Sequence, residues 1–264
     1  VIEFPSPNTN KPLHLGHVRN IIFGQAVVEI LRNQGNKVTI VNLNNDRGIH
    51  ICKSMLAYKL YGKSSTPAKE KIKSDHFLGK YYVLYSKNEK KLEDKAIKML
   101  QAWENGDKET LALWKKMNKW ALSGFEETYN KFNLKIDKHY YESEHYKEGK
   151  EIIYKAKEKG ILEQKEDGAY FIDLGDKGLG EKILLRGDGT SIYITQDINL
   201  AHKKEKEFHP DKSIIVTATE QNYHFKVLFE VLRRIAFKGA ASLIHLGYGM
   251  VNLEEGRMKS REGN

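Results

Sequence analysis

The segment His14 to His17, with the sequence His-Leu-Gly-His, combines residue types that suit phosphate chemistry. A helical pattern begins at this segment, directly behind a short apolar strand, Val1 to Phe4. The free backbone N–H groups and the positive end of the dipole at a helix start attract anions. Gly16 leaves room for a ligand to approach, and His17 can donate to a phosphoryl oxygen. The segment is a candidate phosphate site, although two polar histidines at a helix cap remain the plainer interpretation.

A second candidate is the basic segment Gly256 to Asn264, which combines lysine and arginine with glycine near both ends. Without other context, such a segment indicates a solvated turn. Beside a histidine-bearing phosphate site, it predicts a mobile loop whose cations close over a polyphosphate.

Alternating strands and helices must position the histidine segment. The pattern predicts a strand at Val1 to Phe4, a helix that ends at Gly35-Asn36, a buried strand at Lys37 to Leu43 and a helix at Ile49 to Tyr61. A polar loop, residues 44–48, follows the second strand. These elements form one βαβα unit.

A second alternating block follows later in the chain. It predicts strand Ile183 to Leu185, helix Ile192 to Glu207, strand Lys212 to Ala218, helix Asn222 to Phe237 and strand Leu243 to Leu246. Two such blocks imply an α/β fold with a Rossmann-like, doubly wound parallel sheet that is split by an insertion. Ligands should bind at the carboxyl ends of its strands.

The residues between the two blocks have a different sequence pattern. Residues 63–138 are charged and helical, and Gly168 to Leu174 has the pattern of a strand in a small appended sheet. We therefore expect residues 1–62 and 183–264 to form the two halves of the core, and residues 63–182 to form a mainly helical connective insertion. Apolar residues at helical spacing in the insertion favour packing over a ligand-binding aromatic box; they are Trp103, Leu111, Trp114, Met117, Trp120 and Phe125.

Composition bounds the class of protein. The 264 residues are 40% hydrophobic, which is sufficient for a full core. The single cysteine, Cys52, excludes an internal disulfide and a cysteine-rich zinc site, and it favours a reducing compartment. No apolar run is long enough to span a bilayer, so we expect an intracellular, cytoplasmic protein. The net charge of +9 is compatible with a polyanionic partner such as RNA, or with a lysine-rich proteome.

Two segments together give a specific resemblance. His14 to His17 matches the first signature of class I aminoacyl-tRNA synthetases, written HIGH, and Arg257 to Arg261 resembles the second, KMSKS. Within that class the chain is similar to arginyl-tRNA synthetases, and the matching segments are Glu3 to His17, Leu185 to Thr190, Tyr193 to Asp197, Glu220-Gln221 with His224, and His245 to Val251.

The resemblance implies that arginine reacts with ATP to give arginyl-adenylate and pyrophosphate, and that arginine then passes to the terminal adenosine of tRNA(Arg). Glu3 and Asp197 correspond to acids that bind the guanidinium group, with Tyr193 adding a phenol. A planar guanidinium fork is best held by carboxylates, and residues four apart share a helix face. Asn8 and Gln221 would hold the α-amino group.

The same resemblance implies an ATP site. His14, Gly16 and His17 would bind the phosphates, Gly247 and Gly249 would let adenine lie against the backbone, and Glu220 would accept from the ribose. The remaining expected ATP-binding residues are Met250, Val251, Arg257, Met258, Lys259 and Ser260. Mg²⁺ would bridge the phosphates, and we expect neither zinc nor a metal held by protein side chains.

The second signature departs from the family pattern. Ser260 stands where the family usually carries the fourth-position lysine, while Lys259 lies one place earlier. Lys11, three residues before His14, is a candidate for the missing cation, with Lys259 as the alternative and a solvated loop lysine as the plainer interpretation of Lys11.

Other functions remain open. The anticodon-binding and amino-terminal tRNA-elbow domains expected of the family are not among these residues, so the chain could bind ATP and arginine without turnover. Another class I synthetase is a further alternative, but Cys52 alone cannot build the zinc site of a cysteinyl enzyme. Two acids favour a cationic amino acid, with lysine still open. The expected partners are L-arginine, ATP and tRNA(Arg), with no membrane, and the expected state is a monomer.

Overall fold

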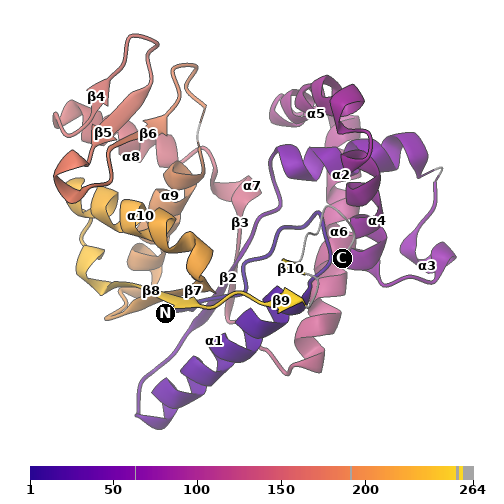
Figure 1. Ribbon diagram of the computed structural model, residues 1–264, viewed down its shortest axis with the longest axis horizontal. Helices are drawn as coiled ribbons and strands as arrows, with labels where there is room; N and C mark the ends of the chain where they lie inside the picture. Colours follow the sequence, from indigo (N-terminus) through magenta and orange to yellow (C-terminus); the bar gives the residue numbers. More distant parts are fainter. Residues whose placement is uncertain (63, 191, 254–255, 258–264) are drawn as a thin grey trace. The chain divides into compact units, whose positions relative to one another are not determined.

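The computed structural model describes residues 1–62, 64–190, 192–253 and 256–257 (Figure 1). The chain forms two compact units that each combine distant segments of sequence. Unit 1 contains Val1–Phe4, Ile30–Val41 and Tyr140–Met250, and unit 2 contains Pro5–Glu29, Asn42–His139 and the described part of 251–264. These units cut across the three predicted sequence blocks.

A five-stranded sheet carries the fold. Its strand order is β3-β2-β1-β7-β8, with β1 at Ile2–Glu3, β2 at Ile40–Asn44, β3 at Lys138–Tyr141, β7 at Ser213–Ala218 and β8 at Leu243–Tyr248. Strand β1 pairs in parallel with both β2 and β7, and β7 pairs in parallel with β8. The carboxyl ends of β1, β7 and β8 therefore meet at one edge of the sheet.

Helices α9 and α10 contribute apolar side chains to the core of unit 1. Helix α9 spans Tyr193–Phe208 and α10 spans Asn222–Arg234, each with an apolar side that enters one buried cluster. Shorter helices and turns complete the unit: α7 (Glu142–His145), α8 (Gly149–Glu158), η1 (Gly175–Lys177), η2 (Thr219–Gln221) and η3 (Ala240–Ser242). A small antiparallel sheet follows the order β4-β5-β6, with strands Glu163–Gln164, Tyr170–Asp173 and Glu181–Leu185.

Unit 2 is mainly helical. It holds most of α1 (Leu15–Asn33) together with α2 (Ile49–Tyr61), α3 (Pro67–Glu70), α4 (Ser74–Ser86), α5 (Glu89–Glu104) and α6 (Lys108–Lys131). Figure 1 shows α2, α4, α5 and α6 gathered in one bundle. Strands β9 (Asn252–Leu253) and β10 (Gly256–Arg257) form a short antiparallel pair.

Aromatic side chains pack the helical bundle of unit 2. Tyr58, Phe77, Tyr81 and Trp120 meet edge to face, with ring centroids 5.1–5.5 Å apart in the Tyr58–Tyr81, Phe77–Tyr81, Tyr58–Trp120 and Phe77–Trp120 pairs. Trp103 is also buried. The predicted packing role of the stripe is confirmed for four of its residues, since Trp120 lies in these ring contacts and Trp103, Met117 and Phe125 are buried.

The sequence prediction was wrong at one strand and missed another. Ile183 to Leu185 was expected in the parallel sheet, but it belongs to β6, which pairs antiparallel with β5 in the small sheet. The intervening turn at Gly178 and Gly180, both with positive φ, folds the chain back as a hairpin, so that β6 pairs with β5. Strand β3 takes the edge position beside β2, although its residues Lys138–Tyr141 are too polar for a buried-strand pattern.

None of the helices in the described part of the chain has both the length and the apolar character needed to cross a bilayer.

Candidate active site

Helix α1 begins with two histidines that cap it reciprocally. The Gly16 N–H donates to Nδ1 of His14 at 3.1 Å, and the His14 N–H donates to Nδ1 of His17 at 3.1 Å. This arrangement resembles a capping box in which imidazole nitrogens replace the usual hydroxyl and carboxylate oxygens. Because Nδ1 accepts in both rings, the proton of each neutral ring lies on Nε2. Each histidine can therefore present an Nε2–H donor to an anion.

Electrostatics keep these rings uncharged. Burial lowers the pKa of His14 to about 4, with the Lys11 cation adding to the effect. Burial also lowers the pKa of His17 well below its usual value, and His14 and Lys11 lower it further. Both pKa values lie below neutrality, so near pH 7 the rings act as neutral hydrogen-bond donors.

Gly16 has a structural role that its sequence position alone does not show. A Cβ atom at this position would lie 2.9 Å from Cε1 and 3.0 Å from Nδ1 of His14. The glycine therefore makes room for the His14 ring to fold over the helix start. This adds to the predicted role of leaving a ligand free to approach.

Helices α4 and α6 support the loop that enters this helix. The Leu13 N–H donates to Oδ2 of Asp75 at 3.4 Å, and Asp75 is fully buried. Lys73 donates to Oδ1 of Asp75 at 2.9 Å and to the carbonyl oxygen of Gly124 at 2.6 Å. A Cβ atom on Gly79 would lie 2.5 Å from Cδ of Pro12, so the loop packs directly on α4.

The sequence analysis missed these supporting residues. The signal available was the pair of glycines, Gly79 and Gly124, inside otherwise regular helical patterns, since an isolated helical glycine often marks close packing. A Cβ atom on Gly124 would lie 2.5 Å from Oδ1 of Asp75.

The loop after β1 is also fixed at Asn8. Asn8 pairs with Asn45 in an isolated parallel bridge, and the Thr9 N–H donates to the Asn45 carbonyl oxygen at 3.1 Å. The Thr9 hydroxyl donates to Oδ1 of Asn118 on α6, and the Asn118 amide donates to the Asp46 carbonyl oxygen at 3.3 Å. The backbone of this loop is thus held by the loop after β2 and by α6.

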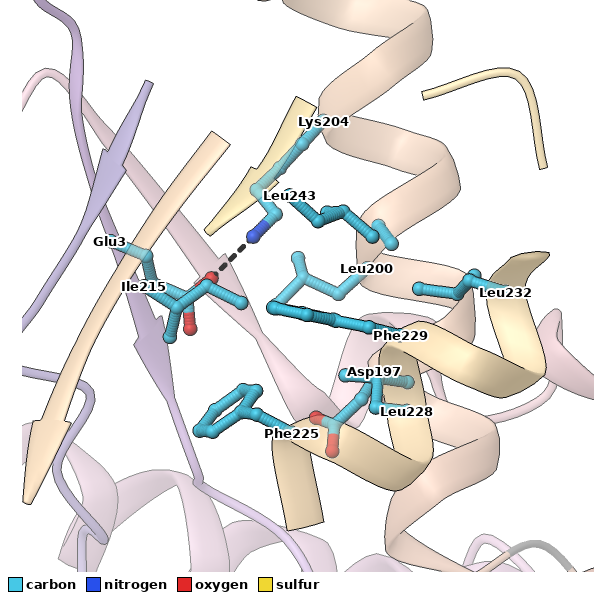
Figure 2. A pocket seen from close by; sticks show the side chains of 11 residues that line it. Glu3, Asp197, Leu200, Lys204, Ile215, Phe225, Leu228, Phe229, Leu232 and Leu243 are labelled. Carbon is cyan, nitrogen blue, oxygen red and sulfur yellow. Dashed lines mark hydrogen bonds and ion pairs between the residues drawn. The ribbon is translucent and has the colours of Figure 1, made fainter. Parts of the chain in front are cut away.

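In unit 1, a buried ion pair joins the central strand to α9. Nζ of Lys204 lies 2.7 Å from Oε2 of Glu3, and the two side chains are 3% and 9% exposed. Both residues line a cavity of about 30 Å³ whose other walls are largely apolar, as Figure 2 shows. Two charges in such surroundings require each other as partners.

Asp197 lines the same cavity and has a different partner. Its Oδ2 lies 2.6 Å from Nε2 of His224 on α10, and both side chains are about three-tenths exposed. In Figure 2 the dashed line joins Glu3 to Lys204, and Asp197 is not part of that pair. Tyr193 lies one turn before Asp197 on α9, so the two residues share a helix face as predicted. Tyr193 is 65% exposed.

The strand ends of unit 1 carry the remaining residues expected there. Glu220 and Gln221 lie in η2, directly after β7, and both are exposed. Gly247 lies in β8, where a Cβ atom would be 3.0 Å from Oδ1 of Asn222 and so would press on the start of α10. A Cβ atom on Gly249 would meet no atom of the described residues within 4 Å, apart from its chain neighbours.

The whole chain, residues 1–264, matches the family model described as tRNA synthetases class I (R), catalytic domain. The chain belongs to this family. The resemblance drawn from the two signatures is therefore confirmed.

Curated relatives extend well beyond the matched region. The chain is 52% identical over 268 residues to an arginine–tRNA ligase of Treponema denticola, and 50% identical over 283 residues to one of Bacteroides fragilis. Both matches cover 100% of this chain but only 45% and 47% of the relatives. The chain spans about half the length of the curated relatives it matches.

Solved structures support the fold class. Arginyl-tRNA synthetase from Thermus thermophilus superposes with a TM-score of 0.78 at 24% identity, covering 97% of this chain and 49% of that chain. The enzyme from Plasmodium falciparum gives 0.74 at 22% identity, covering 94% and 42%. At these identities the likeness concerns the fold, and the predicted Rossmann-like α/β class is confirmed.

The predicted site residues of this synthetase domain divide between the units. Unit 1 holds Glu3, Tyr193, Asp197, Glu220, Gln221, Gly247, Gly249 and Met250, and unit 2 holds Asn8, Lys11, His14, Gly16, His17, Val251 and Arg257. Strand β10 includes the backbone of Arg257. Met258, Lys259 and Ser260 lie outside the described residues. The assigned roles of all these residues remain predictions.

Gly16→Ala should displace the His14 ring and lower arginine-dependent ATP–pyrophosphate exchange by roughly 10–100-fold, since small misplacements of ligand-orienting groups have effects of this size. Circular dichroism should show the helix content unchanged, because alanine favours helix formation.

Ala26→Gly is the matched control for Gly16→Ala. Ala26 is exposed on the same helix, and glycine there should lower the free energy of unfolding by up to about 1 kcal/mol without reducing exchange. Parent-level exchange in Gly16→Ala would show that the His14 ring position does not matter.

Lys204→Met should lower the free energy of unfolding by about 3–5 kcal/mol, because it leaves the buried Glu3 carboxylate without its cation. The double variant Glu3→Gln with Lys204→Met should recover most of that loss in urea unfolding. Lys165→Met, which breaks the exposed Lys165–Glu181 pair, is the matched control and should change stability little. A small loss in Lys204→Met would contradict this account of the buried pair.

Proposed function

We propose that this chain is the catalytic domain of an arginine–tRNA ligase, which activates L-arginine with ATP and transfers it to tRNA(Arg). The observation that carries the proposal is that two carboxylates, Glu3 and Asp197, line one cavity in unit 1. Asp197 is 28% exposed at this cavity, so its carboxylate can accept from the cationic side chain of arginine. Family membership and the names of the curated relatives support the same conclusion.

Arginine recognition is assigned mainly to unit 1. Asp197 and Glu3 accept hydrogen bonds from the planar guanidinium group, and Tyr193 adds its phenol. A guanidinium group offers five N–H donors in a fixed fork, which matches carboxylate oxygens. Asn8 and Gln221 are assigned to the α-amino group, since neutral amide oxygens accept from an ammonium without adding charge.

Phosphate handling is assigned to the start of α1. An oxygen of the arginine carboxylate attacks the α-phosphorus of ATP, a P–O bond forms, and the bond to the pyrophosphate oxygen breaks. The carboxylate is already ionised and pyrophosphate leaves as an anion, so the step requires no protein base. The Nε2–H groups of His14 and His17, held neutral, donate to the charged phosphoryl oxygens.

The rest of the nucleotide is assigned to the strand ends and the basic segment. Glu220 accepts from the ribose, and adenine lies along the backbone of Gly247, Gly249, Met250 and Val251. Arg257, Met258, Lys259 and Ser260 complete the phosphate site. Mg²⁺ enters with ATP as part of the substrate. The described residues contain no group of three or more His, Cys, Asp or Glu side chains placed to hold a metal ion.

Lys11 is assigned the role of the cation that the second signature lacks. Its charge lowers the pKa of both His14 and His17, which supports a position close to the phosphate-binding rings. Lys259 is the alternative.

The net charge and the single cysteine bear on the partner and on the cellular compartment of the protein. The net charge of +9 suits a nucleic-acid substrate, and the buried thiol of Cys52 suits a reducing compartment. We place the enzyme in the cytoplasm, as a monomer.

The direct test is arginine-dependent ATP–pyrophosphate exchange, measured with and without tRNA(Arg) and with lysine as the competing amino acid. Exchange with arginine and not with lysine is the expected result. Asp197→Asn should lower kcat/KM for arginine by roughly 10–100-fold, the usual effect of losing a charged hydrogen-bond partner. Asp94→Asn, a change at an exposed position on α5, is the matched control and should retain parent activity.

Other outcomes discriminate between the open alternatives. Calorimetric binding of arginine without exchange would favour a domain that binds its substrates but depends on the rest of a longer protein. Exchange with lysine and not with arginine would show that lysine is the amino-acid substrate. Loss of exchange in Lys259→Ala but not in Lys11→Ala would move the essential cation to Lys259.

A further inference from the structure

The two carboxylates in the cavity of unit 1 have partners of different chemical character. Glu3 is paired with Lys204, which carries a charge throughout the neutral pH range. Asp197 is paired with His224, a residue whose charge can change near neutral pH. Asp197 therefore has a partner whose charge can respond to a bound cation.

The geometry leaves one Asp197 oxygen for a ligand. His224 contacts Oδ2 at 2.6 Å, and within the described part of the chain Oδ1 accepts no hydrogen bond. The Asp197 side chain is 28% exposed, so a ligand can reach it. A carboxylate held through one oxygen keeps a fixed orientation and offers the other oxygen to an incoming N–H donor.

We propose that His224 is a positioning residue for arginine, which holds Asp197 through Oδ2 and loses a proton when the guanidinium group binds to that carboxylate. The proposal rests on the proposed function, because it takes arginine as the ligand of Asp197. It adds a residue and a proton that the resemblance to the family does not assign.

The charge balance explains why the proton leaves. With His224 protonated, the Asp197–His224 pair has no net charge, and a guanidinium group would bring a second cation against the same carboxylate. With His224 neutral, the pair carries one negative charge, and its Nε2–H still donates to Oδ2. Guanidinium binding and protonation of His224 therefore oppose each other.

The groups around His224 are compatible with this linkage. From α9 the facing group is Asp197, which raises the pKa of His224 through its hydrogen bond. From β8 it is His245, whose pKa is lowered by burial and by His224, and which also contacts the Thr217 hydroxyl at 2.7 Å. Turn η2 carries Glu220, and turn η3 carries no titratable residue. These opposite shifts place the pKa of His245 below that of His224, so His224 is protonated in preference to His245.

The opposition between the two cations makes arginine affinity depend on pH. The free protein holds the His224 proton up to a raised pKa, and bound arginine lowers that pKa. Arginine affinity should therefore rise with pH through the window between these two values and become constant above it. Each pKa unit of lowering corresponds to about a tenfold gain in affinity across the window.

The test is isothermal titration calorimetry of arginine binding to the chain, between about pH 6 and pH 9, in phosphate and in Tris. These buffers differ in ionisation enthalpy, so the difference in measured heat gives the number of protons released. The parent should release a fraction of a proton per arginine within the window and none at the highest pH.

Variants separate positioning from simple structural support. His224→Gln keeps an N–H donor but cannot titrate, so it should bind arginine within a few-fold of the parent at high pH, with the pH dependence and proton release lost. His224→Leu removes the donor and should weaken binding by roughly tenfold at every pH. His202→Gln, on α9 and bonded only to the Ile198 carbonyl oxygen through its side chain among the described residues, is the matched control and should keep the parent profile.

Each contrary result has a distinct meaning. Proton release that persists in His224→Gln, or arginine affinity in the parent that does not change with pH, would overturn the role of His224 and leave the proposed function intact. Failure of the parent to bind arginine at any pH would overturn the proposed function itself, and the role of His224 with it.

Discussion

Carboxylates in apolar surroundings must have partners, and unit 1 is organised around two of them. Glu3 sits on the central strand, where parallel strands on both sides and α9 bury its side chain. Lys204 projects from α9 to neutralise it, and the apolar stem of the lysine covers part of the same cavity. Asp197, two turns earlier on α9, is more exposed and is held by a hydrogen bond from His224. One acid thus has a permanent counter-charge, and the other is more exposed and has a titratable partner.

The start of α1 also contains polar groups that need partners, and here they are backbone N–H donors. The first N–H groups of a helix have no partner within the helix, so they must be satisfied by side chains, water or a ligand. Here two imidazole rings accept from the backbone through Nδ1, which leaves the proton of each neutral ring on Nε2. Burial lowers the pKa of both rings, so near pH 7 they are neutral hydrogen-bond donors with a fixed tautomer.

The mainly helical segment of unit 2 supports this arrangement through particular contacts. Asp75, buried on α4, accepts from the backbone just before His14, and Lys73 ties the same carboxylate to α6. Asn118 on α6 holds the loop that carries Asn8. A segment that interrupts the core in sequence therefore supplies hydrogen bonds that fix the loop before α1. This explains why helices rich in surface charge also contain buried polar residues.

The sequence by itself determined the elements whose signals are local. The histidine signature marked the start of α1, the alternation of strands and helices predicted the parallel sheet, and helical spacing predicted the packing of Trp120 and its neighbours. Tertiary structure decided the rest, because pairing depends on which surfaces meet. It placed β6 in the small sheet, brought Lys204 to Glu3 across 201 positions of sequence, and set His224 against Asp197. Hydrophobic periodicity reports which side of an element is buried, but it carries no information about the partner that a buried charge will find there.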